Sequence, residues 1–175
     1  MSPELARLDV RVTASLEGLS AGQAQAVPLG RANGWNIQQI VEHLLLTYAA
    51  TCENFETRLA KGTPTRAATS VMQHLGQFAL LRLGYFPHGR QAPANVTPSA
   101  PFHPYSGAEL QINLHAALDR LDRLIGASEA LFGSRRAISH PILGPLSASQ
   151  WRTFHLVHGL HHRKQMQAIR QDHGF

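Results

Sequence analysis

The chain has 175 residues, of which 43% are hydrophobic, so it is long enough to bury a substantial core as a single domain over residues 1–175. Its first twenty residues are charged and lack an apolar segment, and no uncharged run approaches membrane length, so we expect a cytoplasmic protein without a signal peptide or membrane span. The net charge of +5 comes from basic residues scattered along the chain, which argues against nucleic-acid binding, and the single cysteine excludes an internal disulfide or a cysteine-based zinc site.

Helical periodicity dominates the first half of the chain. A first helix is predicted from Ser2 and Pro3, which suit the cap and first helical position, to about residues 20–22. A second helix runs from the cap at Asn36 to about Lys61, where a glycine and a proline stop it. A short third helix is predicted from about Ser70 to Leu83, with an inward apolar face formed by Val71, Leu75, Phe78 and Leu81, to which Leu80 could also belong.

The second half begins with a loop. The segment from Tyr85 to Tyr105 holds five prolines and no sustained period, which predicts a long Pro-rich crossover loop. A fourth helix runs from the cap at Ser106 to Gly133, and the segment 139–147 is predicted to be a rigid turn into the last helix. No strand alternation of useful length occurs, so we predict an all-α fold of four long antiparallel helices and one short helix.

The last helix, predicted to start with a capping box at Ser147 and Gln150 and to cover residues 151–171, carries an unusual pair of histidines on its inward face. Counting about 100° per residue, His158 and His162 fall on one narrow face, at positions where a plain bundle helix would carry leucine or isoleucine. Their i, i+4 spacing places both imidazoles over the same patch, close enough to share one metal ion. The alternative is a buried pair whose ring nitrogens are satisfied by protein groups.

A third histidine stands apart from the apolar stripe of the second helix. By the same count His43 lies about 120° away from that stripe, on a strip of small and polar residues. Such a strip suits the lining of a cleft at the edge of a bundle. The alternative is a histidine that is simply exposed.

Two segments resemble a known family. Trp35 and His43 within WNIQQIVEHL, and the H-x-x-H-H-R-x-Q pattern from His158 to Gln165, resemble the motifs of the DinB-like (YfiT-type) superfamily of metal-binding four-helix bundles. The segment HPILGPLSASQW resembles a branch of that superfamily with no assigned function. The resemblance implies a divalent metal ion, most commonly zinc or nickel, held by His43, His158 and His162, with a fourth position left for water or substrate.

The helical angles then suggest neighbours for such a site. His155 lies about 60° from His158 and one turn earlier, and Gln165 lies about 20° away and two turns later, so both could orient ligands or substrate. His161 lies on the shoulder of the helix, where a role beside the site competes with exposure.

Two functions fit this pattern. The first is an enzyme whose metal activates water or a thiol, as a hydrolase or thiol-dependent transferase acting on a small molecule; the resemblance adds low-molecular-weight thiols as candidate substrates. The second is a non-enzymatic bundle with a structural metal ion or none. No HExxH segment supplies a glutamate base, so the catalytic base is not identified. Apolar helix faces left over from the core could support a homodimer.

Overall fold

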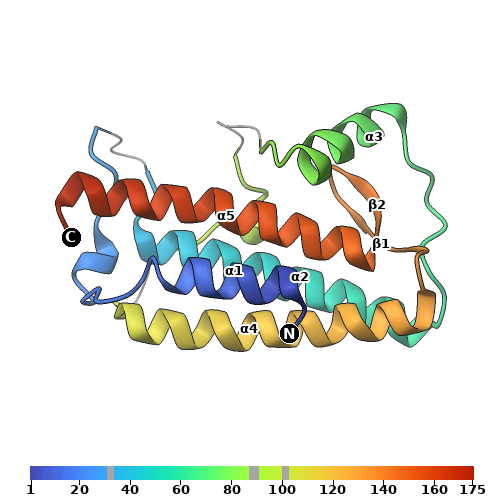
Figure 1. The fold of residues 1–175 in the computed structure, drawn as a ribbon, viewed down its shortest axis with the longest axis horizontal. Helices are drawn as coiled ribbons and strands as arrows, with labels where there is room; N and C mark the ends of the chain where they lie inside the picture. Colours follow the sequence, from blue (N-terminus) through green and yellow to red (C-terminus); the bar gives the residue numbers. More distant parts are fainter. Residues whose placement is uncertain (31–33, 87–90, 100–102) are drawn as a thin grey trace.

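The computed structural model describes residues 1–30, 34–86, 91–99 and 103–175. Within these ranges the chain forms five α-helices, two short 3-10 helices, a π-helical turn and a two-stranded sheet (Figure 1). The prediction of a mainly helical fold is confirmed, and a small two-stranded sheet accompanies the helices. Among the described residues, no helix combines the length and the apolar character that crossing a membrane requires.

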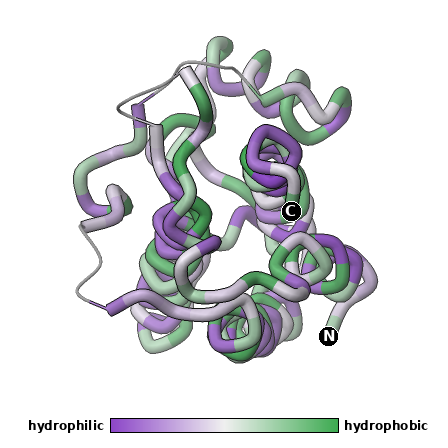
Figure 2. The backbone as a smooth tube through the Cα atoms, turned by 90° about the vertical axis from the view of Figure 1, so that its left-hand side faces the viewer, coloured by the Kyte–Doolittle hydropathy of each residue, from purple (hydrophilic) through white to green (hydrophobic). Residues whose placement is uncertain are grey.

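Four helices lie along one another and enclose the core, as the side view and the view along their axes both show (Figures 1 and 2). They are α1 (Pro3–Thr13), α2 (Ile37–Lys61), α4 (Gly107–Phe132) and α5 (Ala148–His173). α2 packs chiefly on α4, and α1 packs chiefly on α5. Each helix contributes an apolar stripe, and side chains such as Leu8, Leu44 and Leu118 are fully buried. Removal of these stripes from water is the main force that holds the helices together.

Local side-chain chemistry sets where the long helices begin. α2, α4 and α5 each open with a reciprocal capping box, formed by Asn36 with Gln39, Ser106 with Glu109, and Ser147 with Gln150. In each box the two side chains satisfy backbone N–H groups that the first turn of a helix leaves unpaired. The predicted starts of these three helices are therefore confirmed.

α1 is shorter than predicted, because it ends at Thr13 rather than near residues 20–22. The hydroxyl of Thr13 donates to the carbonyl of Asp9, and that of Ser15 donates to the carbonyl of Arg11. The backbone then tightens into i to i−3 hydrogen bonds from Ser15 and Leu16. Side-chain hydroxyls that bond to helix carbonyls disturb a helix in this way. The chain nevertheless stays on the core, because Leu16 is fully buried.

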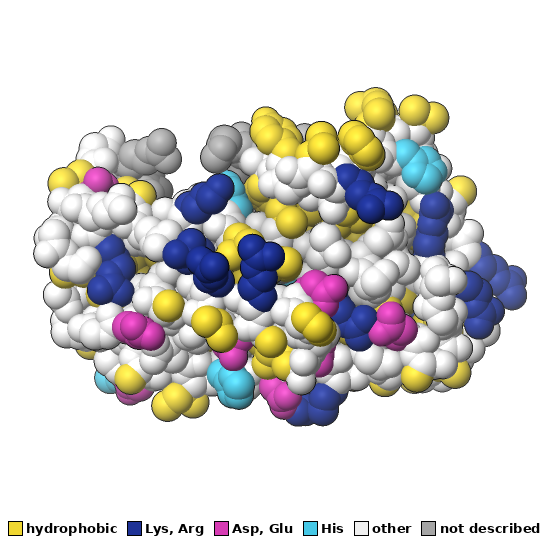
Figure 3. Space-filling model, in the orientation of Figure 1, with side chains coloured by type: hydrophobic (Ala, Val, Ile, Leu, Met, Phe, Trp, Pro, Cys, Tyr) yellow, Lys and Arg dark blue, Asp and Glu magenta, His cyan; other side chains and the backbone are white. Residues whose placement is uncertain are grey.

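The predicted short helix is present, but its apolar face points outward. α3 (Val71–Gln77) continues into the π-helical turn η2 (Phe78–Arg82). Val71, Leu75 and Phe78 are 76%, 59% and 58% exposed, so the prediction that they face inward is wrong. Figure 3 shows hydrophobic side chains gathered on the surface over α3. The homodimer that such a face could support stays a prediction.

A buried glutamine explains the orientation of α3. The side-chain amide of Gln77 donates to the carbonyls of Leu143 and Pro145 at 2.8 and 3.2 Å. Gln77 is 7% exposed, so losing these hydrogen bonds would leave a buried amide unpaired. The helix thus attaches to the rest of the protein through this polar side chain and the turn after it, where Leu80 is buried.

The carbonyls that Gln77 binds belong to a β-hairpin that the sequence did not predict. β1 (Arg136–His140) pairs antiparallel with β2 (Gly144–Ser147), in place of the predicted rigid turn. The pairing puts Ser139 opposite Pro145, and a register shift separates Arg136 from Ile138. Strands this short give too few alternations to be distinguished from a loop.

The described part of the Pro-rich segment packs on α2. Its described part contains one 3-10 turn, η3 (Ala94–Val96), whereas residues 87–90 and 100–102 of the predicted loop lie outside the described residues. Gln38 anchors the loop by donating to the carbonyl of His103 and accepting from the backbone N–H of Tyr105, both at 2.9 Å. One turn later, Glu42 accepts hydrogen bonds from the backbone and hydroxyl of Ser99. Two polar side chains of α2 therefore hold the loop.

Close approach of α1 and α5 requires a glycine. A Cβ at Gly159 would lie 2.4 Å from Leu8 Cδ1, and Leu8 is fully buried. We expect Gly159→Ala to lower the free energy of unfolding by about 1–3 kcal/mol, the usual cost of overpacking a core. The measurement is urea denaturation followed by circular dichroism.

The matched control is Gly126→Ala in α4, where an added Cβ meets nothing within 4 Å. There the change should raise the free energy of unfolding by up to about 1 kcal/mol, because alanine favours the helix more than glycine does. Equal effects at the two positions would contradict the close packing of α1 on α5.

Candidate metal centre

Three histidines from two helices meet at one point. His43 lies in the second turn of α2, and His158 and His162 lie one turn apart in the middle of α5. The Nε2 atom of His158 is 3.1 Å from that of His43 and 3.0 Å from that of His162. One ring nitrogen of each histidine lies within 4.8 Å of the others. The structure therefore brings together the three residues that the sequence analysis grouped as metal ligands.

The spacing of these nitrogens suits a small divalent cation. Four ligands held tetrahedrally at the usual zinc to nitrogen distance of about 2.0–2.1 Å lie about 3.3 Å from one another. The two Nε2 separations of 3.1 and 3.0 Å are close to that value. Both are slightly shorter than that value, so these two contacts would widen a little to admit an ion, while the remaining pair of ring nitrogens lies within 4.8 Å.

Hydrogen bonds on the far side of two rings fix which nitrogen faces the centre. His43 Nδ1 lies 2.7 Å from the carbonyl oxygen of Val96, and His162 Nδ1 lies 2.7 Å from Oε1 of Gln165. Both partners are acceptors, so each Nδ1 carries the proton and each Nε2 presents its lone pair to the centre. Metal-bound histidines are commonly held in this way.

This tautomer assignment makes the cluster incomplete without a cation. Only His158 can place a proton among the three Nε2 atoms, and that proton can serve one neighbour at a time. At least one of the two short nitrogen contacts then opposes two lone pairs. A cation at the centre would satisfy all three nitrogens, so the donor set fits a metal ion better than it fits a hydrogen-bonded histidine cluster.

Burial keeps the three rings neutral. His43, His158 and His162 are 5%, 4% and 6% exposed. Removal from water, followed by the proximity of His43, lowers the pKa of His162 to about 3. Burial likewise lowers the pKa of His43 and, together with the neighbouring histidines, that of His158. Neutral imidazole is the form that binds metal, so all three rings are ready to do so near pH 7.

Aromatic rings enclose the cluster. The Trp35 ring lies 5.1 Å from that of His43 and 6.5 Å from that of His162, measured between centroids. Phe86 and Phe154 stack on His158 at 5.3 and 5.4 Å. This apolar surrounding restrains the imidazoles and strengthens electrostatic interactions at the centre.

Gln165 and His161 lie beside the cluster and support it. The Gln165 amide accepts from His162 and donates, at 3.3 Å, to Nε2 of His161. The His161 ring in turn stacks on Phe86 at 4.6 Å. Although Gln165 is exposed, both the oxygen and the nitrogen of its amide form hydrogen bonds, so it fixes the orientation of His162.

His155 occupies a deeper position than the angle from His158 suggested. It is fully buried, stacks on Trp151 at 5.6 Å and lies edge-on to Tyr48 at 5.3 Å. Neither ring nitrogen has a hydrogen-bond partner within the described residues. His155 therefore lies in the core below the cluster.

The sequence analysis missed two contributors from the Pro-rich segment. The carbonyl of Val96 sets the tautomer of His43, and Phe86 packs on two of the α5 histidines. A backbone carbonyl is the same for every residue type, so the sequence cannot mark it as a hydrogen-bond acceptor. The segment also lacks a hydrophobic periodicity from which its contacts could be inferred. The one available hint was the strip of small and polar residues that carries His43; Gln38 and Glu42, which hold this loop, lie outside that strip.

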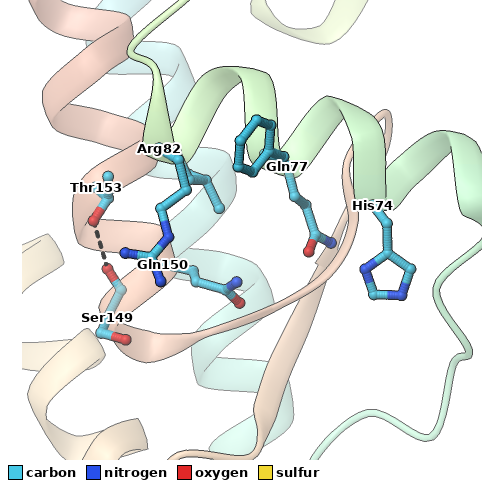
Figure 4. Close-up of a pocket in the computed structure, with 8 residues that line it drawn as sticks. His74, Gln77, Arg82, Ser149, Gln150 and Thr153 are labelled. Atoms are coloured by element: carbon cyan, nitrogen blue, oxygen red, sulfur yellow. Dashed lines mark hydrogen bonds between the residues drawn. The ribbon is translucent and has the colours of Figure 1, made fainter.

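A separate open pocket lies between α3 and the first turns of α5 (Figure 4). Its polar lining includes His74, Arg82, Ser149 and Thr153, and Arg82 extends toward the start of α5 in this view. None of the three clustered histidines lines it. It is therefore distinct from the candidate metal centre.

Comparison with known proteins gives a family but no activity. The model of a family described as "Protein of unknown function (DUF1569)" matches residues 6–168, which cover most of the chain and all three clustered histidines. No curated protein and no solved structure matches the chain.

The hydrogen bond from His162 to Gln165 gives a direct test of support for the cluster. We expect Gln165→Leu to weaken binding of Zn²⁺ by about 10-fold or more, within the range typical for loss of a partner that orients a metal ligand. Isothermal titration calorimetry measures the Kd. Gln171→Leu, an exposed glutamine farther along α5, is the matched control and should bind as the unaltered protein does.

The buried histidines also predict how the metal-free protein responds to acid. Burial lowers the pKa of His140 to about 4, and burial together with the nearby His140 lowers that of His155 to about 3. Below the ordinary value of 6.5 the unfolded chain binds protons that the folded protein does not. The free energy of unfolding should therefore keep its full value above about pH 6.5. As the pH drops below that value, it should fall by about 1.4 kcal/mol per pH unit for each such histidine.

Urea unfolding between about pH 7 and about pH 4.5 measures this slope. His155→Phe removes one of the responsible groups and should make the slope shallower. A slope that stays the same in the variant would show that His155 takes up its proton equally in both states.

Proposed function

We propose that this chain, which belongs to the DUF1569 family of unknown function, binds a divalent metal ion through His43, His158 and His162. We further propose that it acts as an enzyme on a small molecule. One observation carries the proposal: Nε2 of His158 lies 3.1 Å from Nε2 of His43 and 3.0 Å from Nε2 of His162, and one ring nitrogen of each histidine lies within 4.8 Å of the others. The hydrogen bonds from His43 to Val96 and from His162 to Gln165 support it, because they leave lone pairs facing that centre.

The resemblance to DinB-like proteins adds the identity of the ion and the fold type. Four helices that lie side by side, with histidines from α2 and α5 at one point, agree with a DinB-like four-helix bundle. Within that superfamily zinc and nickel are the usual ions. Three imidazoles suit both, so either ion is expected to bind.

The chain's own residues define what the site could do. Three protein ligands leave one position at which a bound ion would polarise water or a thiol. Trp35, Phe86 and Phe154 would limit the water around that position and present an apolar wall to the reacting group. Such a wall favours a soft, weakly hydrated atom such as sulfur, so we favour a thiol-dependent transferase over a hydrolase.

The proton acceptor of the reaction is not the carboxylate next to His43. Glu42 accepts hydrogen bonds from the backbone N–H and the hydroxyl of Ser99 at 3.3 and 3.0 Å. Both bonds use its Oε1 atom and engage Glu42 in holding the loop. His161 is half-buried beside the cluster, but its Nε2 accepts a hydrogen bond from Gln165, so a metal-bound hydroxide is the better candidate to take up a proton.

A second function is favoured by the depth of the site. The three histidines are at most 6% exposed and continue the core formed by Phe154 and Trp151. An ion so enclosed could serve to stabilise the fold rather than to catalyse a reaction. The two functions differ in how much of the free energy of unfolding depends on the ion: much of it for a structural ion, and little of it for an active-site ion.

The deciding experiment measures metal content, affinity and thermal stability together. We expect the purified protein to contain about one equivalent of zinc or nickel by mass spectrometry, and His158→Ala and His162→Ala to lose it. Loss of the ion with Tm largely retained favours the enzyme, whereas loss of the fold favours a structural ion. His74→Ala, an exposed histidine on α3, is the control and should retain the ion. A protein that binds neither ion would contradict both functions.

The same sample distinguishes the two chemistries. Replacement of the ion by Co²⁺ gives a visible spectrum that responds to its ligands. Addition of a small thiol such as β-mercaptoethanol should produce a sulfur to cobalt charge-transfer band if a thiol reaches the fourth position. An unchanged spectrum would leave hydrolysis as the favoured reaction.

A further inference from the structure

Three side chains in the core below the metal centre carry buried polar atoms that lack hydrogen-bond partners in the described part of the chain. These atoms are the hydroxyl oxygen of Tyr48, both ring nitrogens of His155 and Nδ1 of His158. The three residues are 1%, 0% and 4% exposed. Unpaired polar atoms are uncommon in protein interiors, because their loss of water is not compensated. Several in one place therefore require an explanation.

The three residues are neighbours across α2 and α5. The rings of Tyr48 and His155 lie 5.3 Å apart at an interplanar angle of 71°. His155 precedes His158 by one turn, and residues three apart on a helix lie on the same face. Phe154 contacts both imidazoles, with ring centroids 5.0 Å from His155 and 5.4 Å from His158. The unpaired atoms thus belong to one cluster.

Both Tyr48 and His155 are neutral at pH 7. Burial raises the pKa of Tyr48, and burial with the nearby His140 lowers that of His155 to about 3. The neutral imidazole offers one N–H donor and one lone pair, and the hydroxyl can donate and accept. The cluster therefore combines donors and acceptors, which is the lining that a buried water molecule requires.

His158 differs from the other two histidines of the metal centre in one respect. His43 Nδ1 donates to Val96 and His162 Nδ1 donates to Gln165, but His158 Nδ1 faces no acceptor among the described residues. A histidine that binds metal through Nε2 ordinarily donates its Nδ1 proton to an acceptor, which fixes both tautomer and ring orientation. His155, whose ring nitrogens also lack partners among the described residues, lies one helical turn from His158.

We propose that Tyr48 and His155 hold a buried water molecule that accepts the Nδ1 proton of His158, so that both act as positioning residues for the metal centre. The water accepts from His158 Nδ1 and from the Tyr48 hydroxyl and donates to one ring nitrogen of His155. Three hydrogen bonds are the usual number for a buried water. The positioning role rests on the proposed function, whereas the water site itself does not.

Tyr48→Phe tests the proposal because it deletes only the hydroxyl oxygen. If the hydroxyl binds the water, the variant has a lower Tm than the unaltered protein and binds Zn²⁺ at least about 10-fold more weakly. If the hydroxyl is truly unpaired, its removal leaves Tm unchanged or raises it. Tyr105→Phe makes the same change at a residue that is 38% exposed and should alter neither quantity.

A second measurement does not depend on metal binding. In the metal-free protein, water–protein nuclear Overhauser effects should detect a long-lived water molecule beside the rings of Tyr48 and His155, and Tyr48→Phe should lose this signal. A Tyr48→Phe protein with undiminished Tm, with an unaltered Zn²⁺ Kd, or with the water signal retained would overturn the proposal. If the unaltered protein binds no metal, the proposed function fails, and Tm and the water signal still decide whether the water site exists.

Discussion

The hydrogen bond between His43 and the carbonyl of Val96 joins the two parts of the molecule on which the candidate centre depends. At 2.7 Å it fixes the His43 tautomer and ties the Pro-rich segment to α2. The same two turns of α2 hold this segment through Gln38 and Glu42. Without these contacts α2 would still pack on the core, but the imidazole of His43 would lack a defined orientation toward α5.

Helix boundaries could be predicted because local groups determine them. The capping boxes at α4 and α5 satisfy backbone donors within four residues of sequence, so their chemistry is visible in the sequence alone. The inward face of α3 could not be predicted, because the buried side chain is Gln77, whose partners in β2 and its turn lie more than sixty residues away. Its apolar stripe gave the wrong face because a pair of long-range hydrogen bonds decided the orientation.

The same division applies to the candidate centre. His158 and His162 could be paired from spacing, because a single helix fixes their relation. His43 could not be assigned by angle alone, since a residue about 120° from the apolar stripe is buried only if another segment covers it. The sequence does not show that η3 provides this cover, and only family resemblance connected His43 with α5. The acceptor for its Nδ1 is the backbone carbonyl of Val96. Any residue at position 96 would supply the same carbonyl, so the sequence gives no sign of this contact.

The loop that carries Val96 has a further consequence for exchange with solvent. It both covers the imidazoles and supplies the acceptor that aligns one of them, so a displacement large enough to admit a molecule also frees His43. On the proposed function, entry of a molecule and retention of the ion would be linked, and the linkage would be reciprocal. A molecule that displaced the segment would weaken ion binding, and a bound ion would raise the energy needed to move the segment.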